Sequence, residues 1–170
     1  MAAGDRGVSG FATAAAPTVL GLFGVALLAA PLRPAEGWLP APVLPLVVVY
    51  FWSIYGPRYL PPASVFAIGL TQDLVLGGPL GLWSGIYLVT QVAALSQRDY
   101  FRGREQKVVW LGFCVAAAFA ASVFWLAMSL VSGAALPWPA LAAQMLATIA
   151  VYPLVAAGFA ELHARGIAKV

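Results

Sequence analysis

The chain has 170 residues, of which 62% are hydrophobic and 9% are charged, and its mean hydropathy is +0.91. A soluble domain is about half apolar and about a quarter charged, so this composition excludes an ordinary soluble protein. The net charge of +3 arises from nine Lys and Arg residues, most of which lie between apolar segments. We interpret these residues as signals of membrane topology, and we expect no nucleic-acid partner.

Six apolar segments follow one another along the chain, separated by charged residues, prolines or glycines. A helix that crosses a bilayer needs about 20 residues, so six such helices with short connections occupy nearly the whole sequence. We therefore predict an all-α integral membrane protein with a single polytopic domain over residues 1–170. The predicted spans are residues 13–32, 42–55, 63–76, 79–96, 108–131 and 138–162.

The distribution of basic residues predicts the orientation of these spans. If the N-terminus is cytoplasmic, eight of the nine Lys and Arg residues lie in cytoplasmic segments and only Arg33 lies outside. Cytoplasmic connections of membrane proteins are enriched in this way, so we expect both termini in the cytoplasm. Four basic residues fall in the connection before the fifth span, where they would attract anionic lipid headgroups: Arg98, Arg102, Arg104 and Lys107.

The sequence offers few groups that support catalysis. It contains one His, one Cys and six Asp and Glu residues, of which only Asp73 lies well inside a predicted span. Neither a nucleophilic triad nor a metal-ligand cluster can be assembled from this inventory. We therefore predict a protein that is not an enzyme and that holds no metal or cofactor.

Asp73 precedes a Gly-Gly-Pro sequence that separates the third and fourth spans. We predict a helical hairpin in which Gly78 caps the fourth helix and Pro79 occupies its first position. The carboxylate would then lie near the N–H groups of Leu80 and Gly81, which lack partners within the helix. Two roles for Asp73 remain open: a lock that pins the hairpin, or a charge that a partner or substrate requires.

The glycines around this turn suggest close helix packing. Gly77, Gly81 and Gly85 recur at every fourth position and predict a face of small residues on the fourth helix. The third span is short, so the turn is expected to lie below the membrane surface, where neighbouring helices must cover its backbone.

Three glutamines lie within predicted spans: Gln72, Gln91 and Gln144. Such amides form hydrogen bonds between membrane helices. Together with Asp73 they would alternatively line a polar cavity.

Residues 67–82, AIGLTQDLVLGGPLGL, resemble the acidic hairpin motif of the rod shape-determining protein MreD family. The short chain, the basic connection before the fifth helix and the scarcity of soluble loops agree with this resemblance. It implies a six-helix protein of the bacterial inner membrane, similar in fold to the substrate-binding subunits of energy-coupling-factor transporters. The site residues that it implies are Gln72, Asp73, Gly77, Gly78, Pro79, Leu80 and Gly81.

The resemblance also implies a function. The protein would be a non-catalytic scaffold of the complex that synthesises side-wall peptidoglycan and maintains rod shape. Its implied partners are an MreC-like bitopic coiled-coil protein, the elongation glycosyltransferase and transpeptidase, actin-like MreB and membrane lipids. The alternative is a small-molecule carrier, in which Asp73 and the three glutamines would form the substrate cavity.

The six-span topology predicts the side on which each connection lies. Reporter proteins fused after Ser96 and at the C-terminus should be cytoplasmic, and a reporter fused at Gly133 should be periplasmic. A periplasmic location of Arg104 would contradict this topology.

Overall fold

The computed structural model describes residues 4–30, 40–101 and 103–167, with side chains for residues 15–30, 40–101 and 103–161. Within these residues the backbone forms α-helices, one 3₁₀ turn and no strand, so the predicted all-α class is confirmed. The helices are α1 (Gly4–Ala29), α2 (Leu44–Tyr55), α3 (Pro62–Leu76), α4 (Leu82–Ser96), α5 (Arg98–Phe101), α6 (Gln106–Ser132) and α7 (Trp138–Ile167). The 3₁₀ turn η2 (Pro57–Tyr59) connects α2 to α3.

The six predicted spans correspond to α1, α2, α3, α4, α6 and α7, but the lengths differ. Helix α1 begins at Gly4 and α7 continues to Ile167, and the short α5 is an element that the hydropathy pattern did not indicate. By length and composition, Gln106–Ser132 and Trp138–Glu161 are each sufficient to cross a membrane. Helices α2, α3 and α4 have 12, 15 and 15 residues. At 1.5 Å per residue they reach only about 18–22 Å of a hydrocarbon core of about 30 Å.

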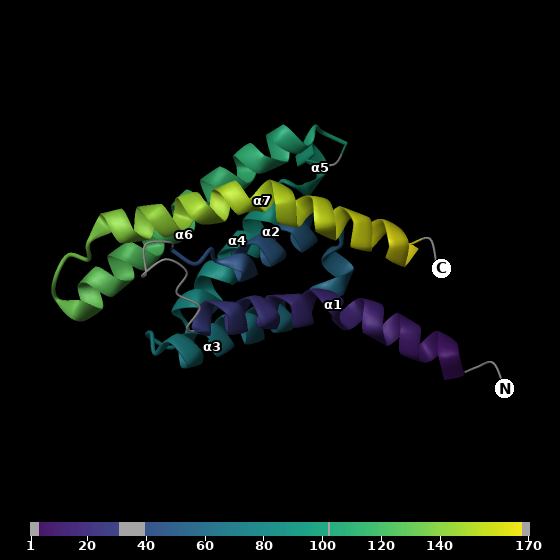
Figure 1. The fold of residues 1–170 in the computed structure, drawn as a ribbon, viewed down its shortest axis with the longest axis horizontal. Coiled ribbons are helices and arrows are strands. Elements are labelled where there is room, and N and C mark those ends of the chain that lie inside the picture. The colour runs from purple at the N-terminus through teal and green to yellow at the C-terminus, as the bar shows by residue number, and fades with distance from the viewer. Residues whose placement is uncertain (1–3, 31–39, 102, 168–170) are drawn as a thin grey trace.

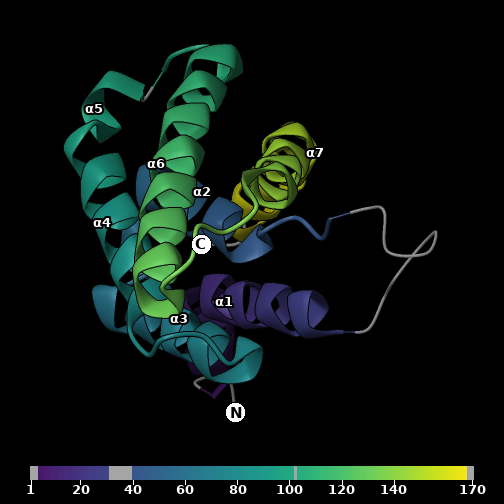
Figure 2. The same cartoon turned by 90° about the vertical axis from the view of Figure 1, so that its left-hand side faces the viewer.

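Helix α2 lies inside the helix bundle, among α1, α4, α6 and α7 (Figure 2). It is apolar on all sides, and the ten residues from Pro45 to Ile54 are buried, as is typical of a helix enclosed by others. Its Tyr50 ring meets Phe113 of α6 and Tyr152 of α7 edge-on, with centroids 5.3 and 6.0 Å apart. Helices α1, α4, α6 and α7 therefore pack around a helix that has no polar face.

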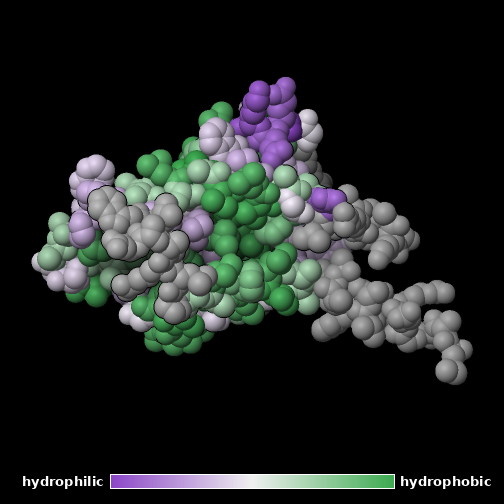
Figure 3. Space-filling view, in the orientation of Figure 1, coloured by the Kyte–Doolittle hydropathy of each residue, from purple (hydrophilic) through white to green (hydrophobic). Residues whose placement is uncertain are grey.

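The connections between helices lie towards two opposite ends of the molecule (Figure 1). The start of α1, the end of α7 and α5 lie towards one end, whereas the α3–α4 turn and the α6–α7 connection lie towards the other. Figure 3 shows a largely apolar middle, with the most hydrophilic side chains gathered over the region of α5. Connections at two opposite ends and an apolar middle are expected of helices that cross a membrane alternately in opposite directions.

Gly69 allows α3 and α4 to approach closely. A Cβ atom on Gly69 would lie 2.4 Å from the Cα of Ser84 and 2.5 Å from its nitrogen. The Ser84 hydroxyl also donates a hydrogen bond to the carbonyl oxygen of Phe66, at 3.2 Å. A small residue on α3 therefore faces the backbone of α4, and only glycine fits there without a shift.

The predicted face of small residues on the fourth helix is wrong. Gly77 follows the end of α3 and Gly81 precedes the start of α4, so only Gly85 of the three lies within a helix. A Cβ atom on Gly85 would meet nothing within 4 Å. The spacing of four residues crosses a turn, and the glycines therefore share no helical face.

Substitution of Gly69 in α3 and Gly85 in α4 should affect stability differently. Gly69→Ala forces the new methyl group against backbone atoms and should lower the free energy of unfolding by about 1–3 kcal/mol. Gly85→Ala is the matched control; it meets open space and should be neutral or stabilising by about 0.5–1 kcal/mol. Thermal unfolding in detergent measures both, and equal stability of the two variants would contradict the close contact.

Candidate functional site

The carboxylate of Asp73 caps the start of α4, although it belongs to α3. It is 1% exposed; its Oδ2 accepts the N–H of Gly81 at 2.8 Å, and its Oδ1 accepts the N–H of Trp83 at 3.0 Å. The bond from Gly81 agrees with the sequence prediction, while Trp83 takes the place of the expected donor Leu80. An N-cap side chain normally satisfies such N–H groups, but Gly81 is the N-cap here and has no side chain. Asp73 supplies the missing acceptor from the preceding helix.

The main chain of Asp73 closes α3 as well. Gly77 adopts the left-handed conformation, with φ of +69°, and the N–H of Gly78 donates to the Asp73 carbonyl oxygen at 3.1 Å. This six-to-one hydrogen bond is the Schellman end of a helix, in which glycine is the residue that meets no steric penalty. One residue therefore ends α3 through its carbonyl and begins α4 through its side chain.

The predicted start of the fourth helix is wrong by three residues. Helix α4 begins at Leu82, so Gly81 rather than Gly78 is its N-cap, and Pro79 lies within the turn. The N–H of Leu82 donates to the Pro79 carbonyl oxygen at 3.2 Å, which closes the turn before the helix begins. Local sequence favours a proline at the first position. The helix begins instead where the Asp73 carboxylate is placed to accept its N–H groups.

The tip of the hairpin is exposed, and the expectation that neighbouring helices of the chain cover it is wrong. Leu80 in the turn is 69% exposed, and Leu74 at the end of α3 is 64% exposed. Helix α6 contacts the hairpin beside its tip, where the Phe124 ring centroid lies 5.2 Å from that of the buried Trp83. The hairpin thus presents an apolar end held by internal hydrogen bonds.

Gln72 lies beside Asp73 and has an open hydrogen-bond donor. Its side chain is fully buried, and its Oε1 accepts a hydrogen bond from the Tyr87 hydroxyl of α4. Its Nε2 is buried and makes no hydrogen bond. A buried donor without a partner costs about 1–3 kcal/mol, so a group that supplies an acceptor here would gain that energy.

A pocket of about 170 Å³ opens at this place. The residues that line it come from the hairpin, α1, α6 and α7: Leu28, Gln72, Asp73, Leu76, Gly77, Gly78, Trp83, Phe124, Met128 and Gln144. The pocket thus brings together two of the three glutamines singled out in the sequence, next to the acid.

The third glutamine lies elsewhere, so the cavity expected from the sequence needs correction. Gln91 lies about 14 Å along α4 from its start, and its Nε2 donates to the Leu60 carbonyl oxygen at 2.8 Å. Gln144 lies at the pocket wall, but its Nε2 donates to the Ala41 carbonyl oxygen at 3.0 Å. Both amides therefore tie helices to neighbouring connections.

The basic connection between α4 and α6 contains the short helix α5. The Arg104 guanidinium lies over the Tyr100 ring, 4.9 Å from its centroid, and both Arg104 and Lys107 are exposed. Arg98 is half-buried, and its Nε is buried without a hydrogen-bond partner. Arg102 lies outside the described residues. Within the described part of the chain, no three His, Cys, Asp or Glu side chains are grouped as metal ligands.

A family model described as the rod shape-determining protein MreD matches residues 13–159, which is most of the chain. The chain belongs to the MreD family. Membership indicates a membrane protein with a role in rod shape determination, acting with protein partners, and the apolar helices agree with a membrane location. Neither a curated protein nor a solved structure matches the chain.

Two residues of this MreD-family hairpin were missed by sequence reasoning: Gly69 and Tyr87. Each contacts a residue 15 positions away along the chain, Ser84 and Gln72 respectively. The resembling stretch includes Gly69, but no local pattern marks it as the point of close approach. Tyr87 is one of two aromatic residues in the apolar helix α4, with no local sign of a polar partner.

Variants of Asp73 test the cap. The two N–H groups bond to different carboxylate oxygens, so Asp73→Asn keeps one acceptor and turns its amide towards the other donor. We expect Asp73→Asn to lower the free energy of unfolding by about 1–3 kcal/mol, and Asp73→Leu to lower it further because both donors lose their partner.

The control is Asp99→Asn, which removes an exposed carboxylate and should change stability by less than about 0.5 kcal/mol. Thermal unfolding in detergent provides the measurement. An Asp73→Leu protein as stable as the wild type would show that these bonds do not hold the hairpin.

Proposed function

We propose that this chain is a non-catalytic scaffold of the bacterial cell-elongation complex, which synthesises side-wall peptidoglycan and maintains rod shape. The match to the MreD family model over residues 13–159 is the observation that carries this proposal. The proposed partners are an MreC-like bitopic coiled-coil protein and, directly or through it, the elongation glycosyltransferase and transpeptidase and actin-like MreB. The proposed fold relationship is to energy-coupling-factor substrate-binding subunits, as the hairpin resemblance implies.

The proposed location is the inner membrane, with six spans and both termini in the cytoplasm. Eight of the nine basic residues fall on the cytoplasmic side in this topology. The start of α1, the end of α7 and α5 lie towards the same end of the molecule (Figure 1), which agrees with an even number of crossings.

The proposed contact with the partner is the tip of the α3–α4 hairpin. Leu74, Val75 and Leu80 are each more than half exposed there, and the Asp73 hydrogen bonds hold the backbone beneath them. A partner's transmembrane helix that packs on this end would cover the apolar side chains at little cost in ordering.

The observations favour a scaffold over a carrier. The hairpin pocket of about 170 Å³ is smaller than the 300–1,000 Å³ or so that ligand sites usually offer. Three of the four polar groups proposed for a substrate are already engaged, since Asp73 accepts two N–H groups and Gln91 and Gln144 donate to carbonyl oxygens. Only the Nε2 of Gln72 has no partner. Such a site has little left with which to recognise a solute.

Depletion and complementation in a rod-shaped host test both the function and the contact surface. Depletion should give round cells, and the wild-type chain should restore rods and retain the MreC-like protein on purification. We expect Leu74→Ala combined with Leu80→Ala to weaken partner retention about tenfold or more, as for the central residues of an interface.

The control is Leu154→Ala, which truncates a side chain of α7 that is 76% exposed and should leave partner retention unchanged. Rod-shaped depleted cells that have lost uptake of one nutrient would contradict the scaffold and favour the carrier. If depleted cells are round but the doubly substituted hairpin variant retains the partner normally, the scaffold function is supported and the proposed contact surface is wrong.

A further inference from the structure

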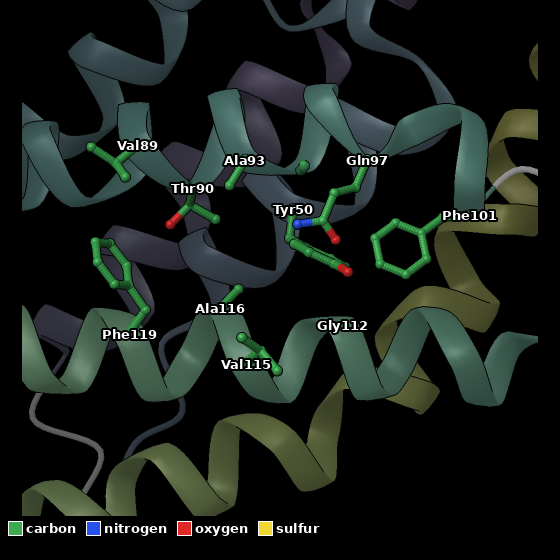
Figure 4. Close-up of a pocket in the computed structure, with 11 residues that line it drawn as sticks. Tyr50, Val89, Thr90, Ala93, Gln97, Phe101, Gly112, Val115, Ala116 and Phe119 are labelled. Atoms are coloured by element: carbon green, nitrogen blue, oxygen red, sulfur yellow. The ribbon is translucent and has the colours of Figure 1, made fainter.

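A second hollow lies between α4 and α6, at the end of these helices that carries α5 (Figure 4). Its volume is about 310 Å³, and its walls are mainly the apolar side chains of Val89, Ala93, Ala94, Val115, Ala116 and Phe119. We refer to it as the α4–α6 groove. It is distinct from the hairpin pocket, with which it shares no lining residue.

The polar groups along the α4–α6 groove are largely engaged. The Thr90 hydroxyl donates to the Ile86 carbonyl oxygen at 2.8 Å, and the Tyr50 hydroxyl at the floor donates to the Val109 carbonyl oxygen at 3.2 Å. The body of the groove therefore suits an apolar occupant.

Small residues create the space in the groove. On α4 and α6 the lining includes Ala93, Ala116 and Gly112. A Cβ atom on Gly112 would lie 2.4 Å from the Tyr50 hydroxyl oxygen and 2.6 Å from the Phe101 ring. Gly112 thus lets these two rings form one end of the hollow, where Figure 4 also shows the Gln97 side chain directed into it.

Positive charge lies at this same end of the groove. Gln97 and Phe101 line the groove and flank Arg98 in the sequence, and the Nε of Arg98 is buried without a hydrogen-bond partner. The segment from Arg98 to Lys107 joins the two walls and holds four basic residues against the two acids Asp99 and Glu105. An anionic group at this end of the groove would lie next to a connection of net positive charge.

We propose that the α4–α6 groove binds one acyl chain of an anionic phospholipid, with the headgroup phosphate on Arg98 and the adjoining basic side chains. An apolar cavity of about 150 Å³ holds benzene, so a volume about twice as large holds roughly twelve carbon atoms of a chain. A transmembrane helix is about 10 Å across and rises about 5.4 Å per turn, so a single turn of it already exceeds this volume. The charge at the open end selects a negative headgroup. This site is independent of the proposed scaffold function.

The test uses the full chain reconstituted in phosphatidylcholine vesicles that contain a trace of spin-labelled lipid. The immobilised fraction of spin-labelled phosphatidylglycerol should exceed that of spin-labelled phosphatidylcholine severalfold at low salt. Replacing Arg98 and Arg104 with Gln should remove this preference, and the variant protein should then immobilise the two spin-labelled lipids to the same extent.

Filling the groove should abolish the preference as well. Ala93→Phe places a ring in the groove from an exposed position of α4, and Val115→Trp fills it independently from an exposed position of α6. The matched control, Ala118→Phe, adds the same ring to an exposed position of α6 outside the groove and should keep the wild-type preference. Thermal unfolding in detergent identifies the variants that are folded.

Equal immobilisation of the two lipids by the wild type would overturn the proposal. So would an undiminished phosphatidylglycerol preference in folded Ala93→Phe and Val115→Trp proteins. If these variants release a partner protein while their lipid preference stays unchanged, the groove is a protein interface and the proposal is wrong.

Discussion

The structure of the hairpin depends on a buried carboxylate, each oxygen of which accepts a backbone hydrogen bond. In an apolar environment the first N–H groups of a helix cannot form hydrogen bonds with water, and each N–H group left unpaired destabilises the fold. Helix α4 follows Gly81, which has no side chain with which to cap it. The Asp73 carboxylate accepts the N–H groups of Gly81 and Trp83, so the acid and the helix start satisfy each other.

The position of α4 follows from this cap. Once its first turn is held on Asp73, Ser84 lies against Gly69 and the Tyr87 hydroxyl reaches Gln72. The same placement buries Trp83 against α6. A change at Asp73 is therefore expected to affect contacts along α4 as well as the turn itself.

Most of the buried polar groups discussed above connect one helix to another or to a neighbouring connection, and two of them retain an open donor. Thr148 of α7 accepts the N–H of Val43 at the start of α2, and Gln91 ties α4 to the connection before α3. The open donors are the Nε2 of Gln72 at the hairpin and the Nε of Arg98 at the basic connection. Gln72 lies at the hairpin whose tip we propose as the partner contact, and Arg98 lies in the connection beside the α4–α6 groove for which we propose a lipid. A protein without a catalytic centre would then act through these two surfaces.

The class of protein, the approximate extent of six of the helices and the place of the acid beside the glycine-rich turn could be predicted from the amino-acid sequence. Each of these depends on properties that are read along the chain: apolar composition, the spacing of charges, and a motif shared with a family. The sequence also correctly predicted that Gly81 donates to Asp73, because both residues flank the same short turn.

Where α4 begins, which glycine allows close packing and which glutamines share a pocket depend on contacts between helices and could not be predicted in this way. Helix α4 begins at Leu82 because the carboxylate of another helix caps it, and Gly69 is the close contact because the backbone of α4 faces it. Gln144 joins Gln72 across more than 70 positions, whereas Gln91 on α4 lies away from the pocket. These outcomes depend on which faces of separate helices meet, and local propensity and hydropathy carry no information about that pairing.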